Sequence, residues 1–588
     1  MLRNKTCGEI RTENIGEEVV LCGWIARRRD HGGLIFVDLR DRYGITQIVF
    51  DPEIAGQAHQ KAEKIRSEFV IQIWGKVQKR APEMENKNLP TGEIEIFATK
   101  IKILNASKTP PFEIETQKEV REDLRLEFRY LDLRREKMQQ NLILRAKMVQ
   151  KIRNYFSQKD FLEIETPILI KGTPEGSREY LVPARLHQGK FYVLPQSPQQ
   201  LKQLLMVAGI DKYFQVPRCF RDEDQRGDRQ PEFTQFEIEM SFPEQKDILE
   251  IVEGCFFELN KNFAQSKNWE KFLQNGKFQK TSWQQAMEKY GIDKPDLRFG
   301  LEFHNLSEIT KNSGFTIFEK AKFLFGLPIT KELAQKITRK NIDDLTEIAR
   351  KSGAGGLAWI RIGENSGPVA KNSTPEFLTN LQKICNAEEG DLIFFGASEE
   401  FIKAVEPLGQ VRLELGNILQ LKNKNDFAYC WVTDFPMFEK NDAGEIGAVH
   451  HPFTRPHPED EEKINSDPLN CRACAYDLVL NGVELGGGSL RIHERNLQKK
   501  IFDILKISDQ DAERRFGHML RAFEYGAPPH GGIAMGLDRV IMLFADEPNI
   551  REVIAFPKNQ NAQDLMLGAP GEMPKDQLDE LGIEINEK

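Results

Sequence analysis

The chain has 588 residues, more than one hydrophobic core usually organises, so we expect several domains. Apolar residues make up 40% of the sequence and charged residues 29%, which excludes a chain that is disordered throughout. The formal net charge of -8 leaves a nucleic-acid partner open, because such binding depends on local basic patches rather than on total charge.

Compartment and redox state follow from simple patterns. The amino-terminal residues carry no apolar signal core and no later stretch is apolar enough to cross a bilayer, so we expect a cytoplasmic protein without a membrane partner. The eight cysteines are scattered, which favours reduced thiols. Cys471 and Cys474 have ligand-like spacing, but no second Cys/His pair matches it, so two packed thiols are favoured over a zinc site.

Five short segments with alternating apolar residues lie within residues 1–104 and predict strands, with a helix near residues 58–66. This pattern is typical of a small closed barrel of the oligonucleotide-binding kind, the OB-fold. Arg27, Arg28 and Arg29 beside Phe36 combine phosphate neutralisation with a stacking platform, which single-stranded bases need. A solvated basic turn on an ordinary barrel is the alternative.

The rest of the chain changes pattern several times. Pro110 and Pro111 mark a linker, and long helices mixed with antiparallel strands follow it. A different pattern between about 290 and 415 predicts an inserted α+β domain, and the tail after about 565 is polar. The limits that we expect are 1–104 for the barrel, 105–120 for the linker, 121–289 and 416–564 for the two parts of a catalytic core, 290–415 for the insert and 565–588 for a carboxy-terminal extension.

The segment 212–242 predicts two strands around a charged loop. Period-two alternation on the first strand separates Phe214, Val216 and Phe220 from Cys219, Arg221 and Glu223; on the second it separates Phe236, Ile238 and Met240 from Phe233, Gln235, Glu237 and Glu239. A sheet face with Arg, Glu and an aromatic ring is costly unless it meets water or a ligand. A ligand face and a solvated ladder of ion pairs are therefore both open.

Asn481 and Gly482 predict a two-residue hairpin turn. Val479 then lies opposite Glu484, which leaves Asp477 diagonal to Glu484 on the same face. Two such carboxylates can share Mg²⁺, a cation that prefers oxygen ligands and a nucleotide phosphate. An ordinary glycine-rich hairpin, with a bulge allowed by the glycines after Leu485, is the alternative.

A third segment leads from glycines into an amphipathic helix. Gly536 and Asp538 at the helix start would let the backbone approach a nucleotide, and Arg539 would offer a fixed cation. No GKS or GKT follows the glycines, so this segment is not a Walker loop.

Together these segments resemble a known family. FLEIETP, CFRDED through Phe233, and GIAMGLDRV are similar, in this order, to the three motifs of the class II aminoacyl-tRNA synthetases. TPEGSREYLVP, LPQSPQQLKQLLM, HHPFT and GGGSLRIH are similar to the bacterial aspartyl branch, and the similarity covers nearly the whole chain. The resemblance implies an antiparallel-sheet catalytic core, activation of L-aspartate with ATP and Mg²⁺, transfer of aspartate to the 3′ end of tRNA(Asp), and a homodimer built through the first motif.

The resemblance also implies roles for individual residues. The expected catalytic residues are Arg221 and Arg539; the expected ATP contacts are Arg221, Asp222, Glu223, Gln230, Phe233, Glu484, Gly536, Leu537, Asp538 and Arg539; the expected Mg²⁺ ligands are Asp477 and Glu484. Aspartate is expected to contact Glu175, Gln199, Lys202, Arg221, Glu237, His450 and Arg491. Glu237 departs from the Asp that the family usually carries, which puts its contact in doubt.

In the barrel, the resemblance implies that Arg27, Arg29, Phe36, Gln47 and Glu95 contact the anticodon. Members restricted to tRNA(Asp) tend to carry Leu after the arginines and Lys in a later loop, whereas this chain has His31 and Glu83. A polar ring beside two flexible glycines can adapt to either pyrimidine, so we expect tRNA(Asn) to be charged as well. A strictly tRNA(Asp)-specific ligase is the alternative. An aspartate–ammonia ligase is more remote, because that class lacks the barrel.

Overall fold

The computed structural model describes residues 1–115, 118–172, 177–364, 366–441 and 444–586. Contacts divide the chain into two compact units, Met1–Ile143 with Ile554–Gly571, and Leu144–Val553 with Glu572–Lys588. Within the described ranges, no helix combines the length and the apolar character that a bilayer span needs.

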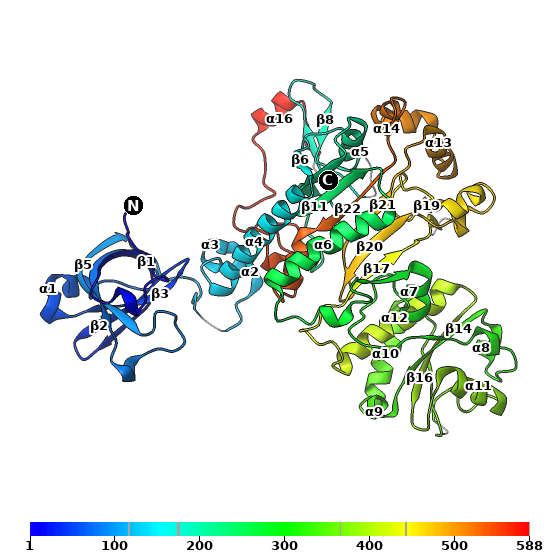
Figure 1. Cartoon of the computed structure of the whole chain (residues 1–588), viewed down its shortest axis with the longest axis horizontal. Helices are drawn as coiled ribbons and strands as arrows, with labels where there is room; N and C mark the ends of the chain where they lie inside the picture. The colour runs from blue at the N-terminus through cyan, green and yellow to red at the C-terminus, as the bar shows by residue number, and fades with distance from the viewer. Residues whose placement is uncertain (116–117, 173–176, 365, 442–443, 587–588) are drawn as a thin grey trace. The chain divides into compact units, whose positions relative to one another are not determined.

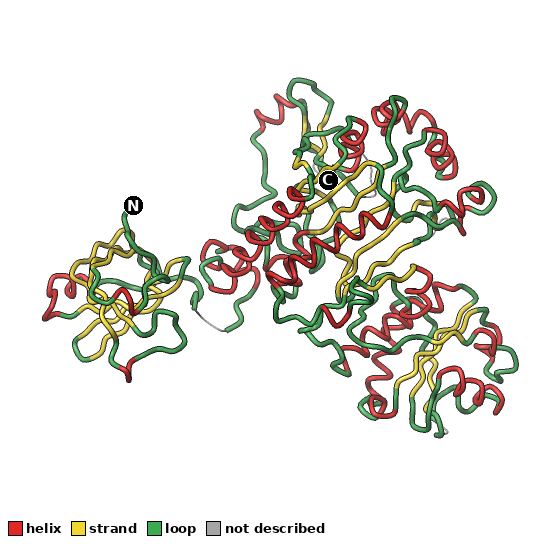
Figure 2. Tube along the Cα trace, viewed as in Figure 1, coloured by secondary structure: helices red, strands yellow, loops and turns green. Residues whose placement is uncertain are grey.

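The first unit contains a closed five-stranded barrel with the strand order β1-β2-β3-β5-β4 (Figures 1 and 2). Alternate residues of each strand point inward, so Val19, Leu21 and Ile25 of β1 join an aliphatic core. The barrel confirms the predicted OB-fold. The elements are β1 (Glu18–His31), β2 (Leu34–Asp41), β3 (Gly44–Phe50), α1 (Pro52–Ala62), β4 (Val70–Lys79), β5 (Ile94–Asn105), α2 (Glu122–Glu127) and α3 (Arg129–Asp132).

The second unit is built on a sheet with the order β12-β17-β20-β21-β22-β11-β9-β6, and β10 pairs with β11. Its central pairs are antiparallel, as the family resemblance implies, while β12 with β17 and β6 with β9 are parallel. The strands are β6 (Leu162–Glu163), β9 (Lys212–Gln215), β10 (Arg218–Phe220), β11 (Glu232–Ser241), β12 (Gln279–Ser282), β17 (Tyr429–Thr433), β20 (Ala475–Leu480), β21 (Val483–Leu490) and β22 (His530–Gly536).

Two helices, α4 (Glu136–Gln158) and α6 (Gln245–Phe263), pack on one face of this sheet; Figure 1 shows α6 running along it. The ring of Phe156 in α4 lies 5.6 Å from that of Phe214, and Phe256 in α6 lies 6.4 Å from Phe236. Glu237 and Glu239 extend from the other face, as the alternation of β11 predicts. The helices therefore leave that other face for a site.

The first strand predicted in the segment 212–242 is divided. β9 ends at Gln215 and β10 begins at Arg218. Pro217 has no N–H to donate to a neighbouring strand, so the ladder stops there. The continuous strand that was predicted from Phe214 to Glu223 is therefore wrong beyond Gln215, although Arg221 still lies beside Phe233, on the face predicted for it.

The inserted region has its own four-stranded sheet with the order β13-β14-β16-β15. Helices α10 and α12 cover one face and α8 and α11 cover the other, each with a separate apolar core. Helix α12 ends at Ile418, so the expected boundary at 415 lies within its last turn. The elements are β13 (His304–Asn305), α8 (Thr316–Lys320), β14 (Phe323–Ile329), α9 (Lys331–Ala334), α10 (Arg339–Lys351), β15 (Ala358–Arg361), α11 (Pro375–Cys385), β16 (Leu392–Ser398) and α12 (Phe401–Ile418).

The remaining helices and short strands surround the second unit's main sheet or lead to the insert. They are β7 (Leu181–Pro183), β8 (Phe191–Val193), α5 (Gln199–Val207), α7 (Trp283–Tyr290), β18 (Phe438–Lys440), β19 (Ile446–Ala448), α13 (Arg495–Ile504), α14 (Asp509–Phe523), α15 (Leu537–Phe544) and α16 (Lys575–Leu581). Of these, α5, α7, β18 and α15 contribute residues to the cavity described next.

Candidate active site and barrel surface

A cavity of about 1620 Å³ opens on the sheet face that α4 and α6 leave free. Its walls come from α5, β11, β20, β21 and the start of α15, and they continue onto α7 and the insert. Among the residues expected to contact ATP, aspartate or Mg²⁺, those that line the cavity are Gln199, Lys202, Arg221, Glu223, Gln230, Phe233, His450, Asp477, Glu484, Arg491, Gly536, Asp538 and Arg539. The fold thus brings together residues that are far apart in the sequence.

One part of the cavity combines a cation with an aromatic ring. The guanidinium carbon of Arg221 lies 5.3 Å from the centroid of the Phe233 ring. Within the described chain, the buried Arg221 Nε has no hydrogen-bond partner. Because a buried donor without a partner is costly, Arg221 is suited to an anionic or hydrogen-bonding ligand. Glu223 nearby forms an ion pair of 3.1 Å with Arg229.

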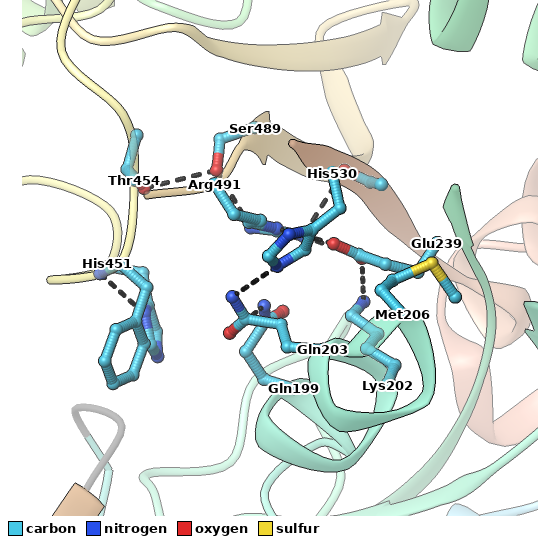
Figure 3. Close-up of polar contacts among 12 residues, drawn as sticks. Gln199, Lys202, Gln203, Met206, Glu239, His451, Thr454, Ser489, Arg491 and His530 are labelled. Carbon is cyan, nitrogen blue, oxygen red and sulfur yellow. Dashed lines mark hydrogen bonds and ion pairs between the residues drawn. The ribbon is translucent and has the colours of Figure 1, made fainter. Parts of the chain in front are cut away.

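At another part of the cavity, two cations and two carboxylates form a buried network, of which Figure 3 shows Lys202, Arg491 and Glu239. Lys202 Nζ lies 3.0 Å from Glu237 and 3.5 Å from Glu239, and Arg491 Nε lies 3.1 Å from Glu239. Burial raises the pKa of the Glu239 carboxyl, but Arg491 and Lys202 outweigh it, so the pKa lies below its usual value. Glu239 therefore stays ionised and holds both cations.

Glu237 lies behind this network. One of its carboxylate oxygens accepts a hydrogen bond from Tyr213 Oη at 2.7 Å, and the other accepts one from Lys202. Glu237 does not line the cavity. In this structure Glu237 orients Lys202. To contact the α-amino group of aspartate directly, as the resemblance implies, Glu237 would have to exchange its hydrogen bond with Tyr213 or Lys202 for one with the substrate.

Two histidines line the cavity beside the buried cations. His450, the expected one, packs edge-on against Phe435 with 4.5 Å between ring centroids. Burial, with the nearby cations Arg491 and Lys202, lowers the pKa of His451 to about 3. Its Nδ1 accepts a hydrogen bond from Phe453 N, so the neutral ring carries its proton on Nε2, a buried atom without a partner in the described chain. His451, to which the resemblance assigned no contact, therefore offers a donor to a ligand.

The predicted hairpin is present. Asn481 and Gly482 have φ values of 54° and 82°, which a type I′ turn requires, and Val479 lies opposite Glu484. A bulge follows, so Asp477 lies opposite Gly487. A Cβ atom on Gly487 would lie 2.4 Å from Asp477 Oδ1, so only glycine leaves room for this carboxylate.

Asp477 and Glu484 have the donor atoms that a divalent cation needs. Burial and then the charge of Glu484 raise the pKa of Asp477 well above its usual value. Asp477 Oδ1 is buried and has no hydrogen-bond partner among the described residues. A costly pair of neighbouring carboxylates with an unsatisfied oxygen fits Mg²⁺, provided that a nucleotide supplies the other ligands.

Helix α15 brings Arg539 to the cavity. Arg539 donates a hydrogen bond to the carbonyl oxygen of Glu484 at 3.1 Å and pairs with Asp228 at 3.1 Å. Asp538 is buried and engaged by Arg145 and by the N–H of Thr234, so its carboxylate secures α15.

Three expected residues stand differently. Leu537 is buried outside the cavity lining, and Asp222 is exposed and also outside it. Glu175 lies outside the described residues.

Cys471 and Cys474 are buried, and their Sγ atoms contact backbone oxygens of Asp467 and Pro456 at 3.4 and 3.5 Å.

On the barrel, the expected anticodon residues form a connected row. Arg29 lies opposite Phe36 on neighbouring strands and pairs with Asp38 at 2.8 Å. Gln47 accepts a hydrogen bond from Arg29 and donates one to Glu95 at 2.8 Å. Arg27, exposed, lies opposite Asp38 on the same pair of strands.

His31 ends β1 at an exposed tight turn. Gly32 and Gly33 have φ values of 59° and 83°, and the carbonyl oxygen of Gly33 contacts His59 Nε2 at 2.9 Å. The two glycines therefore form a tight turn, which the contact with His59 ties to α1. Glu83 lies exposed in a single helical turn, Pro82–Met84.

Comparison with known proteins decides the family. Residues 121–560 match the model for tRNA synthetases class II (D, K and N), and residues 19–104 match that for the OB-fold nucleic acid binding domain. The chain belongs to the class II tRNA synthetases. Enzymes of this class use ATP as a substrate, so the cavity described above is the candidate site for it.

Relatives of this class II synthetase match along its whole length. A protein named aspartate–tRNA(Asp/Asn) ligase from Rubrobacter xylanophilus is 50% identical over 99% of this chain and 97% of its own. An aspartate–tRNA ligase from Phocaeicola vulgatus is 48% identical over 100% of both chains.

Solved structures confirm the fold of this synthetase. An aspartyl-tRNA synthetase from Entamoeba histolytica has a TM-score of 0.60 and 18% identity, with 95% of this chain and 92% of that chain covered. The asparaginyl-tRNA synthetase from Pyrococcus horikoshii, complexed with asparaginyl-adenylate, has a TM-score of 0.60 and 17% identity, with 95% and 98% covered.

Proposed function

We propose that this chain is an aspartate–tRNA ligase that activates L-aspartate with ATP and esterifies it to the 3′ end of tRNA(Asp). The observation that carries the proposal is the buried pair of cations, Lys202 and Arg491, in the same cavity as Arg221, Phe233 and Arg539. Full-length relatives that bear this enzyme name support it.

In the first step, an oxygen of the substrate's α-carboxylate attacks the α-phosphorus of ATP, and the bond from that phosphorus to the bridging oxygen breaks. Aspartyl-adenylate and pyrophosphate are the products. Negative charge develops on the phosphorus oxygens and on the leaving group, and Arg221 and Arg539 are the fixed cations that meet it. The adenine ring would lie between Phe233 and Arg539. Glu223 and Gln230 would contact the nucleotide.

In the second step, the terminal hydroxyl of the tRNA attacks the aspartyl carbonyl carbon, the bond from that carbon to the phosphate oxygen breaks, and AMP leaves with that oxygen and the hydroxyl proton. The substrate carboxylate is itself the first nucleophile, so no covalent enzyme intermediate is needed. When bound, Mg²⁺ would be held by Asp477 and Glu484 and would neutralise charge on the ATP phosphates.

Selection of aspartate over asparagine follows from the buried cations. Lys202 and Arg491 each have a partner in Glu239, but the pair can also receive the side-chain carboxylate of the substrate. An amide in the same place would bring no charge to two desolvated cations. His451 Nε2 and His450 would add donors, and Gln199 would meet the α-amino end together with Glu175.

The activation step tests this proposal. Aspartate is expected to support exchange of label between pyrophosphate and ATP, while asparagine and lysine are expected to give only background exchange. Equal exchange with asparagine would overturn the aspartate assignment, whereas no exchange with any amino acid would argue against an activating enzyme. An aspartate–ammonia ligase would also activate aspartate, but it has no use for the barrel at β1–β5.

The barrel is proposed to bind the anticodon. Phe36 would stack on the central base, Gln47 and Glu95 would read base edges, and Arg27 and Arg29 would neutralise phosphates. The hydrogen-bonded row from Arg29 through Gln47 to Glu95 supports this assignment, because it fixes the side chains before a base arrives.

We further propose that tRNA(Asn) is aspartylated at a rate comparable to that of tRNA(Asp). The two anticodons differ only at their third position, C against U, and His31 at the tied turn presents a polar ring where restricted enzymes carry Leu. One base is worth about 1–3 kcal/mol, so one residue can decide the outcome. Purified transcripts of both tRNAs provide the measurement. Preference for tRNA(Asp) above several hundredfold would contradict the relaxed assignment.

A matched pair of variants locates the discrimination. His31→Leu is expected to reduce aspartylation of tRNA(Asn) more than that of tRNA(Asp). Glu53→Lys, an added charge at an exposed position of α1, separates a specific effect of the turn from a general gain in phosphate attraction, since added charge away from the turn should raise both rates together.

The protein is proposed to be a cytoplasmic homodimer. The segment around the first motif exposes the large apolar side chains of Leu162, Ile168 and Leu169, and Leu181 and Phe191 follow it. Neighbouring apolar surface of this kind marks an interaction site. Light scattering at micromolar concentration should give about 135 kDa, twice the 67.7 kDa of one chain. A mass near that of one chain would contradict the dimer.

A further inference from the structure

Lys294 lies where the inserted region meets the two candidate metal ligands. Its Nζ is 3.5 Å from Glu484 Oε2 and 3.2 Å from Asp293 Oδ2. Burial lowers the pKa of Lys294, but the charges of Asp293, Glu484 and Asp477 outweigh it. The ammonium group therefore neutralises part of the negative charge on the hairpin of β20 and β21.

The backbone on both sides of Lys294 is secured to α12 of the insert. Before it, the Gly291 carbonyl oxygen is so close to Gly409 that a Cβ atom there would lie 2.4 Å from it. After it, the fully buried Arg412 donates hydrogen bonds to carbonyl oxygens of residues 296, 299, 300 and 301. A displacement of Lys294 is thus constrained by the insert.

We propose that Lys294 is a positioning residue, an internal counter-ion that holds the Asp477–Glu484 pair without a metal and yields Glu484 when a divalent cation binds. The inference rests on the proposed function, since it assumes that these carboxylates bind the metal of Mg·ATP. Two cations cannot share Glu484 without repulsion. Asp293, already 3.2 Å away, can keep Lys294 as the metal enters.

This exchange gives the insert a part in the reaction. Lys294 and Asp293 lie between the end of α7 at Tyr290 and the segment that Arg412 secures. Metal binding would therefore be resisted by a charge that the insert positions.

The test measures divalent-cation affinity directly with Mn²⁺ as the probe. The full-length protein without nucleotide is titrated, and free Mn²⁺ is followed by electron paramagnetic resonance. Lys294→Met should bind Mn²⁺ about tenfold more tightly than the unaltered protein, because an opposing charge next to the carboxylate is gone. Lys294→Arg keeps the charge and should stay close to the unaltered protein. Lys289→Met removes the charge of an exposed lysine that pairs with Glu302, and it should leave the affinity for Mn²⁺ unchanged.

Equal or weaker Mn²⁺ binding in Lys294→Met would overturn the proposal, and the weaker result would mean that Lys294 assists the metal or its phosphate. A second readout is the concentration of free Mg²⁺ that gives half-maximal exchange, which should fall in Lys294→Met and not in Lys289→Met. Failure of the proposed function would differ from failure of this inference. The unaltered protein would then show no aspartate-dependent exchange, whatever the Mn²⁺ titration gives.

Discussion

Arg221→Ala should lower aspartate-dependent ATP–pyrophosphate exchange by at least about a hundredfold, since removal of one preorganised donor from developing charge costs that much or more. Arg221 Nε has no hydrogen-bond partner in the described chain, and its guanidinium group stays beside Phe233. The variant therefore loses no strong internal bond at this atom. Arg539→Ala should have an effect of the same order, because Arg539 is the other cation that is proposed to meet the charge developing on the phosphate oxygens and the leaving group.

The matched control is Arg218→Ala in β10, the strand that ends directly before Arg221. Arg218 carries the same charge only three positions away, but it is exposed and pairs with Glu232 outside the cavity. Its loss should leave exchange near that of the unaltered protein, because exposed ion pairs contribute little. Normal exchange in Arg221→Ala, with an unchanged free energy of unfolding, would show that Arg221 takes no part in the reaction.

Arg491→Met should abolish activation of aspartate and also destabilise the second unit. Arg491 is 5% exposed, and its loss leaves Glu239 with the more distant Lys202 as its cation among the described residues. Breaking a buried ion pair by removing one partner costs about 3–5 kcal/mol, mostly through the charge left behind. Denaturant unfolding measures the second effect, and pyrophosphate exchange at high aspartate concentration measures the first.

The double variant Arg491→Met with Glu239→Gln separates the two roles. It removes the cation together with the charge that needed it, so much of the stability should return. Exchange with aspartate should stay absent, because the cation that receives the substrate carboxylate is gone. Recovery of exchange along with stability would mean that Arg491 is purely structural.

Much of the local structure could be predicted because it depends on short-range signals. Asn481 and Gly482 set their turn through backbone conformations that few residues adopt, and the pairing of Val479 with Glu484 follows from it. The alternation on β11 predicted that Phe236 and Glu237 face opposite ways. The barrel followed from five alternating segments with turns between them.

What could not be predicted depends on contacts across the fold. No local pattern brings Lys294 to Glu484, or Arg491 to Glu239, because the partners are distant in the sequence. Asp538 could be assigned as the residue that secures α15 only once the position of Arg145 was known. His451 gave no signal beyond its place next to His450, and its unpartnered Nε2 is visible only when the backbone donor to Nδ1 is located.

The most direct measurement of the central claim is transfer of labelled aspartate to a purified tRNA(Asp) transcript in the presence of ATP and Mg²⁺. The predicted result is an aspartyl ester at the 3′ end that forms at catalytic enzyme concentrations and depends on an intact anticodon. Labelled asparagine and lysine should give no ester. Absence of aspartyl-tRNA, in a preparation that still exchanges pyrophosphate with aspartate, would contradict the assignment as a tRNA ligase.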